Sequence, residues 1–161
     1  MIRRYLVLLS MAVILSAGMS VASAREEIRY ELTSESWFGV VCELCYCPDS
    51  IAELSGTFLL RETGEEGGFQ TFDVLEVQWR TRGGTQAAVT GSGTFRQWGT
   101  SGRQQQLELD LSVGDEELHV TSGPVEAEME LPRIAIQVET SLKPTCRDRI
   151  FFLSAQPKPT D

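Results

Sequence analysis

The sequence predicts an all-β protein, a single antiparallel β-barrel or β-sandwich of about nine strands that is stapled by disulfides. Apolar and polar residues alternate along most of the chain, Gly-rich turns separate the alternating runs, and no long stretch keeps a helical period. Alternation of this kind is typical of strands with one buried and one solvated face. Many short strands between turns are typical of sandwiches and barrels.

The alternating runs define the expected strands in chain order. In the run 106–113, for example, Leu107, Leu109 and Leu111 point to one side while Glu108 points to the other. A residue-by-residue alternation of this kind places every second side chain in the core. The expected strands are 28–33, 55–61, 71–81, 87–95, 106–113, 117–121, 125–131, 134–139 and 149–154.

Turn signals separate these runs, at 62–68, 82–84, 99–102, 114–116, 122–124 and 143–144. One exception to the all-β pattern is expected, because Ser50 and Glu53 after Pro48 fit a capping box for a turn or two of helix. The segment GSGTF (91–95) has two glycines inside a strand pattern, which predicts a bulge or a bend where the sheet curls. The alternative, a phosphate loop, needs a following helix that the pattern does not predict.

The first 24 residues fit a cleaved secretory signal. Arg3 and Arg4 precede an apolar run over 5–17, and Ala22 and Ala24 supply the small residues that signal peptidase requires. The alternative is an uncleaved membrane anchor, which needs about 20 apolar residues. We therefore expect a signal peptide over 1–24 and an exported protein, periplasmic or extracellular.

The rest of the chain predicts one domain, because no repeat or linker divides it. We expect the β domain over 25–156 and a disordered tail over 157–161. Cleavage leaves 12 basic and 23 acidic residues, for a net charge of −11. Nucleic acid and anionic lipid surfaces attract clustered Lys and Arg. We therefore expect no nucleic-acid partner and no membrane span after cleavage, and a small ligand or an envelope protein as the partner.

The cysteines are the strongest chemical signal in the sequence. Cys42, Cys45 and Cys47 lie in VVCELCYCPDS (40–50), and Cys146 follows much later. An even number of cysteines in an exported chain favours disulfides. A Cys45–Cys47 bridge would close a strained ring and ranks last. The two other pairings join Cys146 to Cys45 or Cys47, and such a bridge would stabilise the fold by up to about 4–5 kcal/mol in the chain-entropy model.

Two other interpretations of the cysteines are weaker. Four thiolates from Cys42, Cys45, Cys47 and Cys146 could hold Zn²⁺ or select Cu(I). Structural zinc sites usually pair two separated couples, however, whereas three of these cysteines share one loop. Thiol–disulfide exchange at CELC needs a low thiol pKa at a helix N-terminus, and acidic Glu43 beside strand-like flanks opposes it. We therefore expect disulfides, with no cofactor and no metal.

Other residues carry weaker signals. His119, the only histidine, should face solvent beside Glu117 and Thr121. Glu126, Glu128 and Glu130 share one strand face and predict a solvated surface. Four large aromatic residues are expected in the core or at its rim and not as a platform for binding sugars; they are Trp37, Phe38, Trp79 and Trp98.

The combination of motifs resembles a family of small exported bacterial β proteins. It consists of C-x-x-C-x-C-P at 42–48, GSGTF at 91–95, SG at 122–123 and C-x-D from Cys146 to Asp148. The family pattern has Gly and Pro where this chain has Val41 and Leu44. The resemblance implies an exported β domain and supplies no activity.

The sequence favours a non-catalytic binding or structural envelope protein. It contains no G-x-S-x-G and no H-E-x-x-H motif, so no catalytic residue is assigned. A metal-handling protein that uses the cysteine cluster is one alternative. An enzyme with an unrecognised pair of carboxylates is the other, because acidic residues are abundant.

Overall fold

The computed structural model describes residues 27–42, 48–83, 86–98, 104–127, 131–140 and 147–159. These residues form ten strands and no helix, which confirms the all-β prediction. Nothing in this part of the chain is therefore a helix of the length and apolarity that crossing a membrane requires. The strands are β1 (Glu27–Leu32), β2 (Trp37–Val41), β3 (Ser50–Glu66), β4 (Phe69–Arg82), β5 (Ala88–Trp98), β6 (Gln104–Val113), β7 (Glu116–Thr121), β8 (Val125–Glu126), β9 (Ile134–Glu139) and β10 (Asp148–Pro157).

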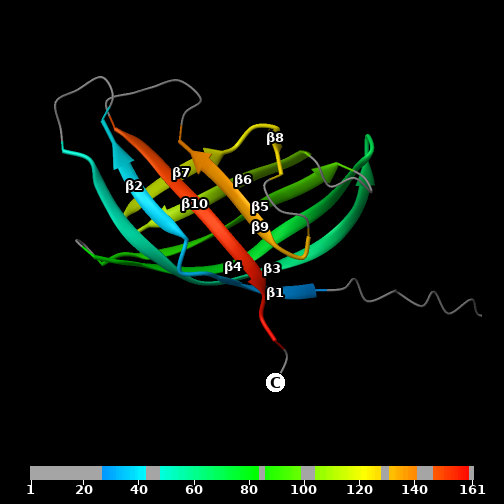
Figure 1. Cartoon of the computed structure of the whole chain (residues 1–161), viewed down its shortest axis with the longest axis horizontal. Helices are drawn as coiled ribbons and strands as arrows, with labels where there is room; N and C mark the ends of the chain where they lie inside the picture. The colour runs from blue at the N-terminus through cyan, green and yellow to red at the C-terminus, as the bar shows by residue number, and fades with distance from the viewer. Residues whose placement is uncertain are drawn as a thin grey trace, which may run out of the picture.

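The ten strands belong to one antiparallel sheet that curls into a ring (Figure 1). Strands β3 to β7 follow one another as a meander, and β8 continues beside β6 after β7 ends. On the other side β10 pairs with β9 along one edge and with both β1 and β2 along its second edge. At one end of the meander β1 and β2 pair with β3. At its other end β7 meets β9, so strands from the two ends of the chain complete the ring.

The ring is closed only weakly where β7 meets β9. Among the described residues, Thr121 opposite Glu139 is the only register pair between these strands. Across this seam, Arg149 on β10 donates two hydrogen bonds to the carboxylate of Glu116 at the start of β7, at 3.0 and 2.9 Å. The fold is therefore a ring-like sheet with one loose seam, and not two separate stacked sheets.

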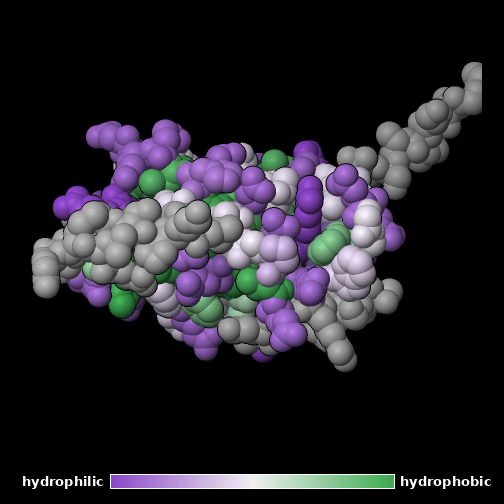
Figure 2. Space-filling view, turned by 90° about the horizontal axis from the view of Figure 1, so that it is seen from above, coloured by the Kyte–Doolittle hydropathy of each residue, from purple (hydrophilic) through white to green (hydrophobic). Residues whose placement is uncertain are grey.

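The inner face of the ring is filled by apolar side chains from every strand, although β2 and β8 contribute only the partly buried Phe38 and Val125. Leu109 and Ile136 are both buried in this core, as predicted, while Asp110 and Gln137 lie outside it. Tyr30 is 2% exposed and stacks on Phe58. Burial raises the pKa of its phenol above 10.0. The face of the molecule seen in Figure 2 is mostly polar, with apolar side chains in separate small patches.

The glycines of GSGTF lie opposite a bulge, which confirms the structural interpretation of that segment. Val74 on β4 pairs with Gly93, whereas Val77 pairs with Gly91, so β4 holds one extra residue there. Glu76 within the bulge has φ of 48°. A Cβ on Gly93 would lie against the backbone oxygen of Glu108 and the Cα of Leu109. The glycine therefore permits β5 and β6 to approach closely where the sheet bends.

Several predicted boundaries differ from the structure. The expected helix after Pro48 is wrong, because Ser50–Glu66 is one long strand whose first residues pair with β2. Cross-strand pairing overrides the local capping signal here. The turn expected over 62–68 shrinks to Gly67 and Gly68, which connect β3 directly to β4. The strand β2 was not predicted at all.

Other expected segments lie wholly or partly outside the described residues. The strand expected over 125–131 is seen as the two residues of β8, and 128–130 lie outside the described residues. The expected signal peptide over 1–24 and the turn at 99–102 also lie outside them. At the other end, β10 continues to Pro157, and the Lys158 N–H donates to the Arg29 carbonyl at 2.8 Å, beyond the boundary expected at Gln156.

Candidate functional site

The most distinctive local feature is a break between β1 and β2, the two strands that share one position in the sheet. Strands β1 and β2 lie end to end between β10 and β3, and the segment Thr33–Ser36 separates them. Leu32 pairs with Ala155 and Trp37 pairs with Phe152, so four residues of the break face two residues of β10. The extra residues cannot stay in the plane of the sheet, and they fold outward over β10.

Two serines satisfy the backbone groups that this break would otherwise leave unpaired. The Ser36 hydroxyl donates to the Ser154 carbonyl at 2.8 Å and accepts from the Ser154 N–H at 3.0 Å. The Thr33 N–H also donates to the Ser154 carbonyl. Ser36 is 1% exposed and Ser154 is 4% exposed. Since buried backbone groups almost always need partners, Ser36 fixes the shape of the break.

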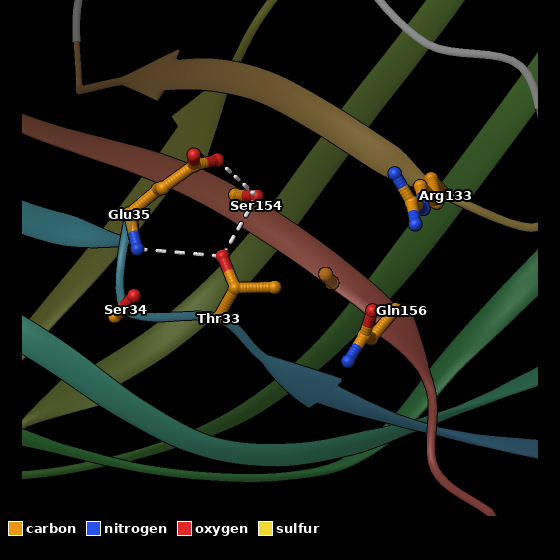
Figure 3. A pocket seen from close by; sticks show the side chains of 7 residues that line it. Thr33, Ser34, Glu35, Arg133, Ser154 and Gln156 are labelled. Atoms are coloured by element: carbon orange, nitrogen blue, oxygen red, sulfur yellow. Dashed lines mark hydrogen bonds between the residues drawn. The ribbon is translucent and has the colours of Figure 1, made fainter.

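A short chain of hydrogen bonds runs across the outer side of the break and ends on a carboxylate (Figure 3). The Thr33 hydroxyl donates to Ser154 Oγ at 2.8 Å, and the Ser154 hydroxyl donates to Glu35 Oε2 at 3.1 Å. The Glu35 N–H donates to Thr33 Oγ1 at 3.3 Å. The Thr33 and Ser154 hydroxyl protons are therefore both used within this chain of hydrogen bonds. Lone pairs of the hydroxyl oxygens and the Glu35 carboxylate are left facing outward.

These residues line a hollow of about 230 Å³ on the outer face of the sheet. We call it the outer hollow; its lining residues are Thr33, Ser34, Glu35, Arg133, Ser154, Ala155 and Gln156. Arg133 lies on the opposite side of Ser154 from Glu35 (Figure 3). Among the described residues, its guanidinium has no ion-pair or hydrogen-bond partner. The hollow thus has one acidic side and one basic side.

An aromatic pair lies next to the outer hollow on the same face. Trp37 directly follows the break, and its ring stacks on that of Phe152, with centroids 6.2 Å apart and an interplanar angle of 19°. Phe152 and Ser154 are alternate residues of β10 and so share one face. Both rings are half-buried. We call Trp37 and Phe152 the aromatic shelf.

His119 lies where the sequence predicted, exposed on the outer face of β7. Its Nδ1 is 2.8 Å from Asp110 Oδ1, and its Nε2 is 3.5 Å from Glu108 Oε1. Each ring nitrogen therefore faces a different carboxylate, so the three groups do not converge on a single point as metal ligands would. Within the described ranges, no group of three or more His, Cys, Asp and Glu side chains could hold a metal ion.

Only Cys42 among the four cysteines lies within the described residues, and it is not a free thiol. Its N–H donates to Asp49 Oδ1 at 3.0 Å. Val41 pairs with Asp148, so the chain enters and leaves the two cysteine-bearing loops at the same end of neighbouring strands. Cys45, Cys47 and Cys146 lie outside the described residues, and the disulfide pairing and the zinc or copper alternative both stay predictions.

The remaining sequence candidates fall into two groups. Trp79 is buried in the core, and Phe38 packs against it. Trp98 is 44% exposed and meets Phe69 edge to face, so it is a rim residue. Glu126 is exposed as expected, whereas Glu128 and Glu130 lie outside the described residues. The described residues of both groups are not among those that line the outer hollow.

The sequence reasoning missed the outer hollow altogether. The one signal that could have indicated it is TSES (33–36), a cluster of turn-forming residues between two apolar runs. No protein-family model, curated protein or solved structure matches this chain. The residues of the site must therefore carry the functional argument by themselves.

Proposed function

We propose that this chain is an exported, non-catalytic binding domain that holds a small polar ligand in the outer hollow. The observation that carries this proposal is that one hollow has the Glu35 carboxylate on one side and, on the other, the Arg133 guanidinium, which has no partner among the described residues. Binding sites typically combine a concave surface with a few precisely placed polar groups. The strands beneath supply a rigid support, because three hydrogen bonds from Thr33 and Ser36 hold the N–H and carbonyl of Ser154.

Two features favour binding over catalysis at this site. Ser154 would be the natural nucleophile, and its hydroxyl donates to the Glu35 carboxylate, but the residue is only 4% exposed. Its oxygen also accepts from Thr33. A nucleophile needs access to the substrate and an adjacent base that can take its proton. The same bonds serve well in a site that only has to keep one shape.

Export and the state of the cysteines belong to the same proposal. The basic start, the apolar run and Ala22 to Ala24 support a cleaved signal. The meeting of β2 and β10 at the cysteine end supports a bridge between the 43–47 loop and Cys146. The intact mass of the exported protein, with and without reductant, tests these points together. We expect a chain that begins at Arg25, has no free thiol and carries no metal; four free thiols with one bound zinc or copper ion would favour the metal alternative.

Binding itself is tested by NMR with ¹⁵N-labelled mature protein and a panel of small cations, anions, zwitterions and sugars. We expect at least one class to shift the amide signals of Thr33, Glu35 and Gln156. The amides of Arg80 and Ala88, which line a different hollow, serve as the internal control. If no member of the panel moves the first set selectively, the binding proposal fails.

A further inference from the structure

We infer that the outer hollow takes a compact zwitterion with an apolar side chain, which is the chemistry of a free apolar α-amino acid. This inference rests on the proposed function, since it names the ligand class of the same site. Its ammonium group would bind at Glu35, its carboxylate at Arg133 and its side chain on the aromatic shelf.

The Glu35 side of the hollow selects a group that is rich in hydrogen-bond donors. The hydroxyl protons of Thr33 and Ser154 are both spent within the chain that ends on Glu35 Oε2. The Thr33 and Ser154 hydroxyls and the Glu35 carboxylate therefore offer a ligand acceptors and a negative charge. An ammonium group carries three donors and a positive charge, so it can bond to the carboxylate and to a hydroxyl lone pair together.

The Arg133 side selects the opposite kind of group. Its guanidinium presents planar donors that match a carboxylate in a two-point contact, and no described residue occupies them. Arg133 directly precedes Ile134, the partner of Ala155, while Glu35 bonds to Ser154. Arg133 thus lies at the start of neighbouring β9, one position beyond the Ile134–Ala155 pair, so the two anchors are about two residues, or roughly 7 Å, apart along the strands and about one strand spacing, roughly 5 Å, apart across them. This interval fits a ligand whose two charges are close together.

A ligand with a single charge fits the hollow less well. A simple cation would neutralise Glu35 and leave the guanidinium of Arg133 unpaired, and a simple anion would do the reverse. Specificity of this kind comes from polar groups that a wrong ligand leaves without partners. A zwitterion satisfies both sides, with no change in the net charge of the complex.

The aromatic shelf supplies the third contact. Ser154 and Phe152 point to the same side of β10, and Trp37 follows Ser36 at the edge of the break. The aromatic shelf lies at the Glu35 end of the hollow, so a side chain that extends from the ligand past Glu35 reaches the rings of Trp37 and Phe152. Both rings are partly exposed, and covering them removes apolar surface from water.

The test is isothermal titration of the mature protein with L-leucine and L-phenylalanine, beside glycine, N-acetyl-L-leucine and L-leucinamide. We expect leucine or phenylalanine to bind more tightly than glycine, which lacks the apolar side chain. The acetylated and amidated derivatives, which each lack one charge, should bind about tenfold or more weakly, the loss expected when one charge-assisted hydrogen bond is removed.

Variants assign the contacts to their residues. Glu35→Gln and Arg133→Gln should each weaken leucine binding about tenfold or more, while Glu126→Gln and Arg82→Gln, exposed charges outside the hollow, should leave it unchanged. Trp37→Leu should reduce the preference for leucine over glycine, with melting temperature as the check that the fold persists. If another class of ligand moves the amides of the hollow and these zwitterions do not bind, this inference is overturned and the proposed function stands. If nothing in either panel binds, both are overturned.

Discussion

Two of the interruptions in the strands of the ring have opposite consequences. On β4 the bulge at Glu76 inserts one residue opposite Gly91–Gly93, and the sheet bends while both neighbouring strands stay paired. Between β1 and β2 the segment Thr33–Ser36 inserts two residues and leaves the sheet. The first interruption shapes the core, and the second forms the outer hollow.

The difference lies in which side chains compensate for the lost pairing. At the β4 bulge the compensation is the absence of side chains, because glycines allow β5 and β6 to close up and Leu109 covers the space. At the β1–β2 break the compensation is polar, because the Ser36 hydroxyl replaces the missing backbone partners of Ser154. An interruption held by polar groups leaves some of them at the surface, where a ligand can reach them.

The largest expected effect concerns the core that the β4 bulge shapes. Leu109→Ala should lower the free energy of unfolding by about 2–5 kcal/mol, because a buried leucine leaves a cavity when it is truncated. Asp110→Ala on the outer face should change it by less than about 0.5 kcal/mol. Chemical denaturation of the two variants makes the measurement. Equal losses would mean that the register of β6 is wrong.

The glycine side of the comparison is tested by Gly93→Ala. The new Cβ would press on the backbone of Glu108 and Leu109, which cannot move away as a flexible side chain could. We expect a loss of about 3 kcal/mol, at the upper end of the range for overpacking. Ser92→Ala, at the adjacent outward-facing position, is the control and should be nearly neutral. A neutral Gly93→Ala would show that β5 and β6 are not held this closely.

The inner face of the ring could be predicted from the sequence, and the outer hollow could not. Alternation located Leu109 and Ile136 correctly, because strands with one wet face have a period of two. Strand β2 was missed because Trp37 and Phe38 are both apolar. Phe38 packs inward, with its ring centroid 4.7 Å from that of Phe151, whereas Trp37 stacks outward on Phe152. Neighbouring residues that are both half-buried erase the alternation.

The hollow itself depends on contacts between distant parts of the chain. Thr33 and Ser154 are 121 residues apart, and they meet only because β1 and β10 pair. Arg133 reaches the same place through the pairing of β9 with β10. Composition and spacing carry no information on such registers. The cysteine motif, by contrast, is conspicuous in the sequence, but it does not predict the outer hollow on β10.

The polar side of the comparison is tested by Ser36→Ala. Removing the hydroxyl leaves the buried N–H of Ser154 without its partner, and we expect a loss of about 2 kcal/mol, within the range for an unsatisfied buried donor. Ser34→Ala lies in the same break but is exposed, and it should stay within about 0.5 kcal/mol of the wild type. Hydrogen exchange of the Ser154 amide is the more direct measurement. An amide that remains equally protected in Ser36→Ala would contradict the assigned role.

The smallest expected effect isolates the backbone of the β4 bulge. Glu76 has φ of 48°, a left-handed conformation that asparagine tolerates and that a β-branched residue resists. Glu76→Asn and Glu76→Val both remove the exposed ion pair with Arg29, so the loss of this ion pair cancels when the two variants are compared. We expect the valine variant to be less stable than the asparagine variant by about 1 kcal/mol, measured by thermal and chemical unfolding. Equal stabilities would mean that the extra residue of β4 relaxes without strain. The bulge would then resemble the β1–β2 break, whose shape is set by hydrogen bonds between polar groups and not by a strained backbone conformation.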